Sequence, residues 1–288
     1  MIVTRFRRYD TAEMNTLRLM AVLAHPDDES LGVGGTLAKY ASEGADVFLL
    51  TATRGDGGRF KGHRPGDPGH PGSAALANIR ETELRAAAAA LGICEVSLLG
   101  YPDRFLDRAD PKEAISRIAD HLRRIRPHVV ITFGPDGAYG HPDHIAISQF
   151  TAAAIVSAAF PGLTAGADPL TAHAVSKFYY IAWPQSTYTA YQSAIQKLVS
   201  TVDGVERQAV PWPNWEITSV IDTRDFWSKV WRAISCHESQ IAAYEPLKSL
   251  SPADHEALWG SQSFYRVFSL VNGGRSLETD LLEGIKNE

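Results

Sequence analysis

Short apolar runs alternate with amphipathic segments along the first two thirds of the chain. The runs have the length of buried strands and occupy residues 20–24, 46–53, 95–100, 128–133 and 175–183. Apolar positions three or four apart predict helices over residues 30–43, 77–91, about 115–125 and 144–159. Strands that alternate with helices are typical of a parallel sheet covered by helices. We therefore predict an α/β fold with a mostly parallel sheet.

The last third of the chain has a weaker pattern. Residues 216–223 predict one more strand, and residues 225–244 predict a long helix. No repeat or low-complexity linker separates this part from the rest. We expect residues 184–288 to pack on a core formed by about residues 17–183, so that residues 1–288 form a single domain.

One long segment between two predicted elements has no regular pattern. Residues 54–73 contain 7 Gly and 3 Pro, a composition that disfavours both helix and strand. Loops of this length in compact domains are usually lids or binding loops. We expect this loop to lie near the mouth of a site.

Composition excludes several classes of protein. Hydrophobic residues make up 44% and charged residues 21% of the chain, as in ordinary globular proteins, which argues against intrinsic disorder. The net charge is −5 and no basic run is present, so nucleic acid is not an expected partner. No apolar stretch reaches the ~18 residues that a membrane span needs.

The two cysteines and the first apolar run bear on localisation. Cys94 and Cys236 are far apart in sequence and form neither a disulfide framework nor a thiolate metal motif. The apolar run at residues 17–24 is followed by HPDDE, where a signal peptide would have a cleavage site. We expect a cytoplasmic protein. The oligomeric state leaves no trace in the sequence.

Polar clusters follow several of the predicted strands. AHPDDES follows the first strand and FGPDGAYGHPDH follows the fourth, while TRGDGG and GYPDR follow the second and third. Taken singly, an Asp near a helix start is a common N-cap, and a His beside a Pro is often a turn residue. Capping does not readily explain four clusters at one edge of a sheet. Ligand sites of open α/β sheets lie at this edge, so we expect a functional site there.

The residue types in these clusters suit metal-assisted hydrolysis. A catalytic zinc site takes three N or O ligands and leaves one position for water. His25, one of Asp27 and Asp28, and one histidine of the HPDH segment supply such a set. The other aspartate is free to take a proton from the bound water, and the other histidine is free to stabilise an oxyanion. Spacing alone leaves open which aspartate is the ligand. Zn²⁺ is expected, and Fe(II), Co(II) or Mn(II) also suit these ligands.

These motifs resemble the PIG-L/LmbE-like zinc-dependent N-deacetylases. The match comprises AHPDDE after the first strand, an Arg in the helix after the long loop, PD after the third strand and AYGHPDH after the fourth. It covers roughly residues 18–183. The family includes deacetylases of N-acetylglucosaminyl-inositol compounds and enzymes of the mycothiol and bacillithiol pathways. The resemblance implies a Rossmann-like three-layer sandwich with its active site at the carboxyl ends of the strands.

The resemblance also implies an activity and a metal site. The enzyme would be a zinc-dependent amidase that removes an acyl group, expected to be acetyl, from the nitrogen of an N-acetylglucosamine-type sugar or small glycoconjugate. His25, Asp28 and His144 would bind the metal, and Asp27 would be the general base.

Further site residues follow from the same resemblance. His141 would be the electrostatic stabiliser or acid, Asp143 would orient its ring, and Tyr139 would contribute a hydroxyl to the developing oxyanion. Arg80 and Asp103 match positions that hold sugar hydroxyls in members acting on sugars. A tail that folds over the site would also bring His237 near it.

Two alternative functions stay open at this point. The first is a catalytically silent sugar-binding module of the same fold, although such a module has no reason to retain Asp27 and His141. The second is a nucleotide-dependent oxidoreductase, because Gly32, Gly34 and Gly35 resemble a dinucleotide-binding turn. These glycines lie about eight residues beyond the strand, whereas that motif requires its first glycine at the strand end.

Overall fold

An eight-stranded sheet forms the centre of the molecule. The computed structural model describes residues 2–6, 16–161, 171–195, 199–202 and 204–286. The strand order is β1-β4-β3-β2-β5-β6-β10-β9, and the five neighbours from β4 to β6 are parallel. The sheet strands are β1 (Ile2–Arg5), β2 (Arg18–Leu23), β3 (Asp46–Thr53), β4 (Glu95–Tyr101), β5 (Val129–Phe133), β6 (Lys177–Ile181), β9 (Ser219–Asp222) and β10 (Ser261–Ser269). A separate hairpin consists of β7 (Val199–Val202) and β8 (Val205–Gln208). The predicted mostly parallel sheet is confirmed.

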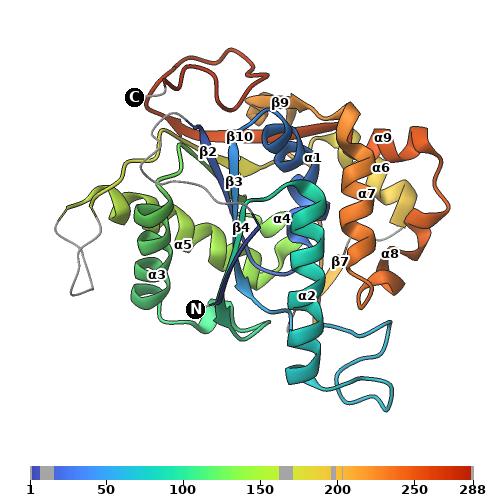
Figure 1. Cartoon of the computed structure of the whole chain (residues 1–288). Coiled ribbons are helices and arrows are strands. Elements are labelled where there is room, and N and C mark those ends of the chain that lie inside the picture. Colours follow the sequence, from blue (N-terminus) through green and yellow to red (C-terminus); the bar gives the residue numbers. More distant parts are fainter. Residues whose placement is uncertain (1, 7–15, 162–170, 196–198, 203, 287–288) are drawn as a thin grey trace.

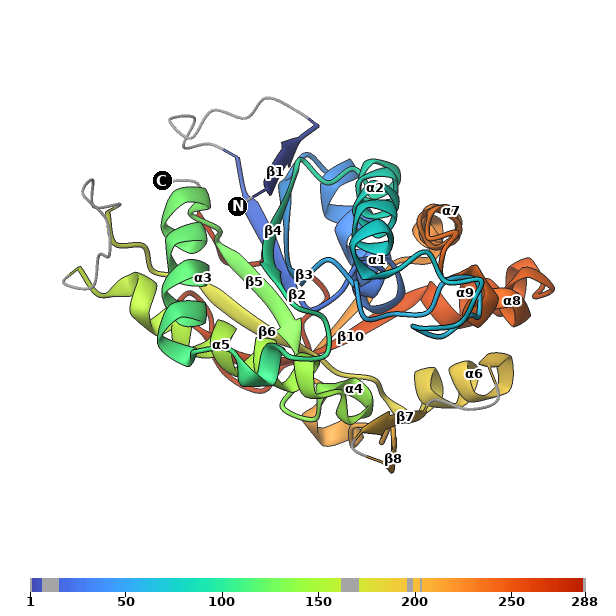
Figure 2. The ribbon, with the colours of Figure 1, turned by 90° about the horizontal axis from the view of Figure 1, so that it is seen from below.

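Helices cover both faces of this sheet, which gives three layers (Figures 1 and 2). One face carries α3 (Pro111–Ile125) and α5 (Pro142–Ala159). The other face carries α1 (Asp28–Ser42), α2 (Ser73–Leu91) and α7 (Trp227–Cys236). α9 (Pro252–Trp259) packs against α7, and α6 (Gln185–Ile195) packs against α9 and α8 (Ile241–Lys248). The short α4 (Gly137–Gly140) precedes α5.

The central strands are mostly apolar because helices cover them on both sides. Every residue of β2 and β3 is buried, with Met20 and Phe48 fully inaccessible to solvent. Side chains on both faces of these strands therefore belong to the core, which explains why they form runs rather than an alternating pattern.

The glycines of α1 allow close helix packing. A Cβ on Gly35 would lie 2.8 Å from the Cβ of Thr223, and one on Gly34 would lie 3.3 Å from Val230 of α7. Both glycines are in the interior of the helix rather than in a turn at the end of β2. Close packing therefore accounts for the glycines of the GVGG sequence, and no phosphate-binding loop is needed to explain them.

The tail differs in two respects from the sequence pattern. The predicted helix over residues 225–244 is divided, because α7 ends at Cys236 and α8 begins at Ile241. The chain turns at His237, where the imidazole Nε2 lies 2.8 Å from Glu29 Oε1 of α1. In addition, the tail strands β7, β8 and β10 have no counterpart among the predicted strands, and neither has β1 at the N-terminus. β10 pairs with β6 and β9 and places part of the tail in the main sheet.

A buried ionic network joins the C-terminal segment to the sheet. Glu278, which is 3% exposed, accepts hydrogen bonds from Lys177 Nζ at 3.0 Å, Tyr179 Oη at 2.8 Å and Ser219 Oγ at 2.8 Å. Burial alone would raise the pKa of Glu278, but these hydrogen bonds lower it to about 2. The carboxylate is therefore ionised across the physiological range.

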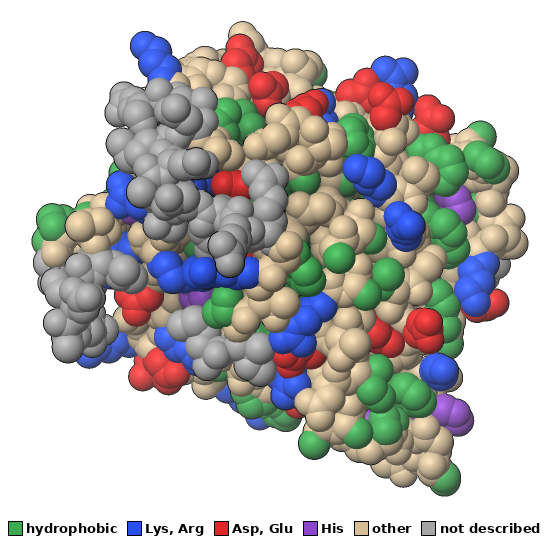
Figure 3. All heavy atoms as spheres, in the orientation of Figure 1, with side chains coloured by type: hydrophobic (Ala, Val, Ile, Leu, Met, Phe, Trp, Pro, Cys, Tyr) green, Lys and Arg blue, Asp and Glu red, His purple; other side chains and the backbone are tan. Residues whose placement is uncertain are grey.

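The described surface has a mixed charge distribution on the face shown in Figure 3. Acidic and basic side chains are interspersed there, without a continuous basic track. Among the described helices, none combines the length and the apolar character needed to cross a membrane.

Candidate metal and catalytic site

Three predicted ligands converge at the carboxyl edge of the sheet. His25 follows β2, Asp28 begins α1, and His144 lies in the first turn of α5. His25 Nδ1 lies 3.1 Å from His144 Nε2. The Asp28 carboxylate lies 3.6 Å from His25 Nδ1 through Oδ2 and 3.4 Å from His144 Nε2 through Oδ1. All three side chains are buried.

Hydrogen bonds aim the two imidazole lone pairs at one point. His144 Nδ1 lies 3.2 Å from the carbonyl oxygen of Gly137, so Nδ1 carries the proton and Nε2 keeps its lone pair. His25 Nε2 lies 3.1 Å from both Asp103 Oδ1 and Asp143 Oδ2, which leaves the Nδ1 lone pair free. Carboxylates or carbonyls behind the imidazoles are typical of metal sites. The donor set therefore fits a divalent metal such as zinc.

Asp28 is held as a carboxylate. Its Oδ2 accepts hydrogen bonds from the backbone N–H groups of His25 at 2.7 Å and Ala24 at 3.2 Å. Burial alone would raise the pKa of Asp28, but the adjacent imidazoles of His144 and His25 and the backbone hydrogen bond from His25 hold it well below its usual range. An anionic oxygen is thus available beside the two imidazoles.

Asp27 lies next to this cluster in a strained conformation. Its φ of 109° falls in the left-handed region, which is rare for a residue with a side chain and is found most often at functional sites. Its Oδ2 accepts hydrogen bonds from Arg80 Nη2 at 3.1 Å and Tyr244 Oη at 2.7 Å. Burial raises the pKa of Asp27, against the opposing charge of Arg80. A carboxylate with a raised pKa suits a general base.

Arg80 and Asp103 both point into the site. Arg80 is 3% exposed and donates to the carbonyl oxygens of Pro26 and Gly55 as well as to Asp27. A Cβ on Gly55 would collide with this guanidinium. Asp103 Oδ2 accepts a hydrogen bond from the N–H of Gly57 at 3.0 Å. The two residues therefore anchor the start of the Gly/Pro-rich loop, and their contact with sugar hydroxyls stays a prediction.

His141 and Tyr139 lie on the α4 side of the metal ligands. One ring nitrogen from each of His25, His141 and His144 lies within 4.8 Å of the other two. Burial and the neighbouring imidazole of His25 lower the pKa of His141 to about 4. The ring centroid of Tyr139 is 5.2 Å from that of His144, and burial raises the pKa of Tyr139 well above its usual range. The phenol therefore stays protonated and can donate a hydrogen bond.

Asp143 makes contacts different from those expected. Its carboxylate faces His25 and accepts hydrogen bonds from the backbone N–H groups of Arg104 at 2.7 Å and Leu106 at 3.0 Å. The hydrogen bond to His141 Nδ1 comes instead from the backbone N–H of Asp143, at 3.2 Å. His141 is the N-cap of α5, so its ring turns back to the helix N-terminus, whereas the Asp143 side chain points toward β2 and β4.

The tail contributes residues to which the sequence assigned no catalytic role. Tyr244 of α8 reaches Asp27, and His237 forms an ion pair with Glu29 in which both side chains are fully buried. The other carboxylate oxygen of Glu29, Oε2, accepts the backbone N–H of Asp27 at 3.0 Å. Tyr244 stands in no local motif, and only the packing of α8 shows its contact.

The Gly/Pro-rich loop is attached to the turn between α7 and α8. The N–H of Lys61 donates to the carbonyl of Ser239 at 2.6 Å, and Gln240 Nε2 donates to the carbonyl of Arg59 at 2.7 Å. Ser239 also donates to the carboxylate of Glu83 in α2. The loop, α2 and this turn thus form one connected wall.

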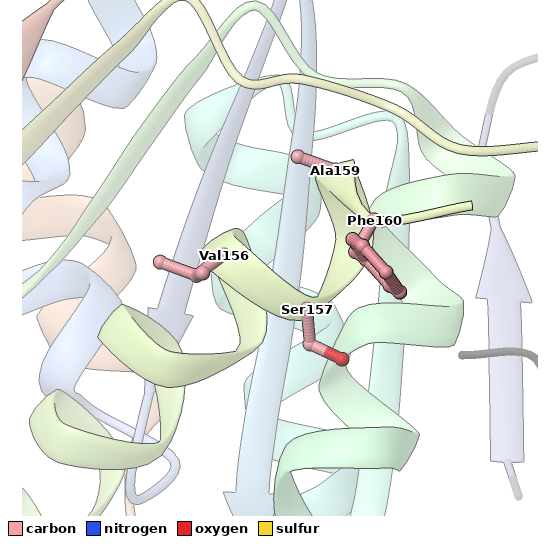
Figure 4. A pocket seen from close by; sticks show the side chains of 4 residues that line it. All are labelled: Val156, Ser157, Ala159 and Phe160. Carbon is pink, nitrogen blue, oxygen red and sulfur yellow. The ribbon is translucent and has the colours of Figure 1, made fainter. Parts of the chain in front are cut away.

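A surface hollow lies far from these residues. It is lined by Val156, Ser157, Ala159 and Phe160 at the carboxyl end of α5 (Figure 4). His144 is at the other end of this helix, about 20 Å away at 1.5 Å per residue. The hollow has no titratable side chain and takes no part in the site.

Relatives with an assigned activity match most of the chain. The 1D-myo-inositol 2-acetamido-2-deoxy-alpha-D-glucopyranoside deacetylase of Kineococcus radiotolerans is 35% identical over 97% of this chain and 88% of its own length. The protein of the same name from Mycobacterium leprae is 32% identical over 94% of this chain and 96% of its own length.

Solved structures share the fold at lower identity. A conserved protein from Thermus thermophilus has a TM-score of 0.62 and 24% identity over 90% of this chain and 98% of its own. An N,N'-diacetylchitobiose deacetylase from Pyrococcus horikoshii has a TM-score of 0.62 and 19% identity over 90% of this chain and 87% of its own. GalB, a 4-carboxy-2-hydroxymuconate hydratase from Pseudomonas putida, has a TM-score of 0.66 and 20% identity over 90% of this chain and 99% of its own. The fold therefore supports more than one reaction, and the site must decide between them.

The sequence match decides the family. The family model described as PIG-L: GlcNAc-PI de-N-acetylase matches residues 20–155, which include the ligand clusters after β2 and β5. Relatives that are 30–35% identical extend the match over most of the chain. The chain therefore belongs to the PIG-L family of de-N-acetylases, as its motifs predict.

Proposed function

We propose that this protein is a zinc-dependent deacetylase acting on the acetamide of an N-acetylglucosaminyl-inositol compound or a similar small glycoconjugate. One observation carries the proposal: two tautomer-fixed imidazoles and an ionised carboxylate converge beside a second carboxylate of raised pKa. The names of the 30–35% identical relatives support the substrate class. We also propose that residues 1–288 form a single domain, because β10 joins the tail to the main sheet. We propose a cytoplasmic location, which the two free cysteines Cys94 and Cys236 support.

His25, Asp28 and His144 would hold the metal in this proposal. When bound, a divalent metal supplies polarisation of the amide carbonyl and lowers the pKa of a water toward ~7. Asp103 and Asp143 keep the proton of His25 on Nε2, so that its Nδ1 stays available.

The remaining residues act on the substrate. Asp27 takes the proton of the attacking water, and Tyr139 donates its hydroxyl hydrogen to the carbonyl oxygen as negative charge develops. His141 accepts the Asp143 N–H on Nδ1, so its hydrogen is on Nε2 and is donated in a hydrogen bond to the same oxygen. Asp27 then passes the proton that it took from the water to the departing amine, which leaves acetate and the free amine. Arg80 and Asp103 are proposed to contact sugar hydroxyls at the rim of the site.

Acetate release is the direct test of this function. The full-length protein, loaded with zinc, is incubated with 1D-myo-inositol 2-acetamido-2-deoxy-α-D-glucopyranoside or with N,N'-diacetylchitobiose. Release that stops with a chelator and returns with zinc is expected. Binding of the sugar without any acetate release would favour the silent sugar-binding module instead. Asp27→Asn serves as a control for release by a contaminating enzyme.

A further inference from the structure

We propose that Tyr244 is a positioning residue for Asp27, which makes Oδ1 the oxygen of Asp27 that takes the proton. This inference rests on the proposed function. It assigns a role to α8, a part of the chain outside the residues matched by the family model.

Both side-chain hydrogen bonds to Asp27 end on the same oxygen. Oδ2 accepts from Arg80 Nη2 at 3.1 Å and from Tyr244 Oη at 2.7 Å. Among the described residues, no hydrogen bond reaches Oδ1. The side chain is 13% exposed, so it is not completely enclosed by protein. Oδ1 is therefore the carboxylate oxygen left for water.

Two donors on one oxygen restrict a torsion that is otherwise soft. Rotation of an aspartate carboxylate about its Cβ–Cγ bond has a broad energy profile, so a single contact defines the orientation poorly. Arg80 comes from α2 and Tyr244 from α8, two helices far apart in the sequence. Contacts from two separate elements define the plane of the carboxylate. A base misplaced by about 1 Å can lose a hundredfold in rate.

The backbone of Asp27 is held independently of its carboxylate. Its N–H donates to Glu29 Oε2 at 3.0 Å, and Glu29 Oε1 is paired with the buried His237 at 2.8 Å. These contacts maintain the strained φ of 109°. Loss of the Tyr244 hydroxyl would therefore release the carboxylate without releasing the backbone, which makes the role of this hydroxyl separable by mutation.

Tyr244→Phe removes only the hydroxyl. The zinc-loaded, full-length variant is assayed with 1D-myo-inositol 2-acetamido-2-deoxy-α-D-glucopyranoside. We expect kcat to fall about tenfold to a hundredfold, with KM changed by less than about twofold, because a hydrogen bond to a charged group is lost at the base and not in sugar binding. Zinc content is expected to stay unchanged, since Tyr244 contacts none of the proposed ligands.

Tyr191→Phe is the matched control. Tyr191 is a buried tyrosine of α6 whose hydroxyl donates to the carbonyl of Leu31 at 2.9 Å and makes no contact with the site. The same hydroxyl accepts a hydrogen bond from Trp259 Nε1 at 2.8 Å, so Tyr191→Phe loses two buried hydrogen bonds outside the site. Its thermal stability therefore falls while kcat stays at the wild-type value. A purely structural role for Tyr244 would give the two variants the same pattern.

A crystal structure of Tyr244→Phe provides a readout that does not depend on activity. The Asp27 carboxylate is expected to rotate or to occupy more than one orientation. An unchanged single orientation, or a kcat equal to that of the wild type, would overturn the proposal. If the wild-type protein releases no acetate, the proposed function fails, whereas the orientation of Asp27 in the variant still decides whether Tyr244 positions it.

Discussion

Asp103 and Asp143 share one proton of His25, and this sharing leads to a prediction about metal affinity. Both carboxylates lie 3.1 Å from His25 Nε2, which carries a single hydrogen. Either carboxylate alone can therefore keep the proton on Nε2 and the lone pair on Nδ1. We predict that Asp103→Asn and Asp143→Asn each weaken zinc binding modestly, whereas the double variant weakens it by more than the product of the two.

The magnitude follows from the contacts. Loss of a hydrogen-bonded group behind a metal-binding histidine typically costs 10–100-fold in affinity. With the second carboxylate in place, we expect about tenfold for each single variant, or ~1.4 kcal/mol. Without either carboxylate, the Nδ1–H tautomer becomes available, and a loss well above a hundredfold is expected from the coupling of the two sites. Asp143→Asn should also lower the free energy of unfolding by ~1–3 kcal/mol. In the wild type, the carboxylate accepts hydrogen bonds from the backbone N–H groups of Arg104 and Leu106, and the NH₂ of an asparagine would replace one of these acceptors with a donor.

Zinc affinity is measured by competition with a chromophoric chelator at fixed pH, and stability is measured by thermal unfolding of the metal-free protein. Asp120→Asn on the exposed side of α3 is the charge-matched control and should leave zinc affinity unchanged, since the only contact it alters among the described residues is the ion pair of Asp120 with Arg123 at 3.6 Å. The reasoning is refuted if the double variant binds zinc as tightly as either single variant. It is equally refuted if one single substitution removes zinc binding and the other has no effect.

Three further predictions concern the base, the tail and α1. Asp27→Asn should keep its zinc while kcat falls by ~10²–10⁴, whereas Asp28→Asn should lose zinc; metal analysis of both proteins would reveal reversed roles. Because the pKa of Glu278 is lowered from 4.5 to about 2, its contribution to stability is complete above pH 4.5 and disappears as the pH falls toward 2. Denaturant unfolding across this pH range should show a steeper loss for the wild type than for Glu278→Gln. Gly35→Ala should destabilise the protein by ~1–3 kcal/mol through overpacking, whereas Gly32→Ala, with its nearest neighbour at 3.5 Å, should be neutral or stabilising. Equal melting temperatures for the two alanine variants would contradict the packing argument.

The local pattern of apolar and polar residues was sufficient to predict the central strands and the helices between them. β2 to β6 are buried on both faces, so each is an apolar run, and each helix between them has a stripe of core residues. The division between α7 and α8 was not predictable in this way. The amphipathic pattern continues through residues 225–244, and the helix ends where His237 meets Glu29, a partner 208 positions away. Similarly, β10 becomes part of the sheet through its pairing with β6.

The sequence by itself determined the family, the chemical nature of the ligands and their place at the ends of strands, because these depend on residue type, order and short spacing. Only the tertiary structure decided which atoms meet. It directs the Asp143 carboxylate to His25 rather than to His141, and it brings Arg80 and Tyr244 to one oxygen of Asp27. Such contacts depend on side-chain rotation and on the packing of elements that are far apart in the chain. The spacing of residues along a sequence contains no information about either.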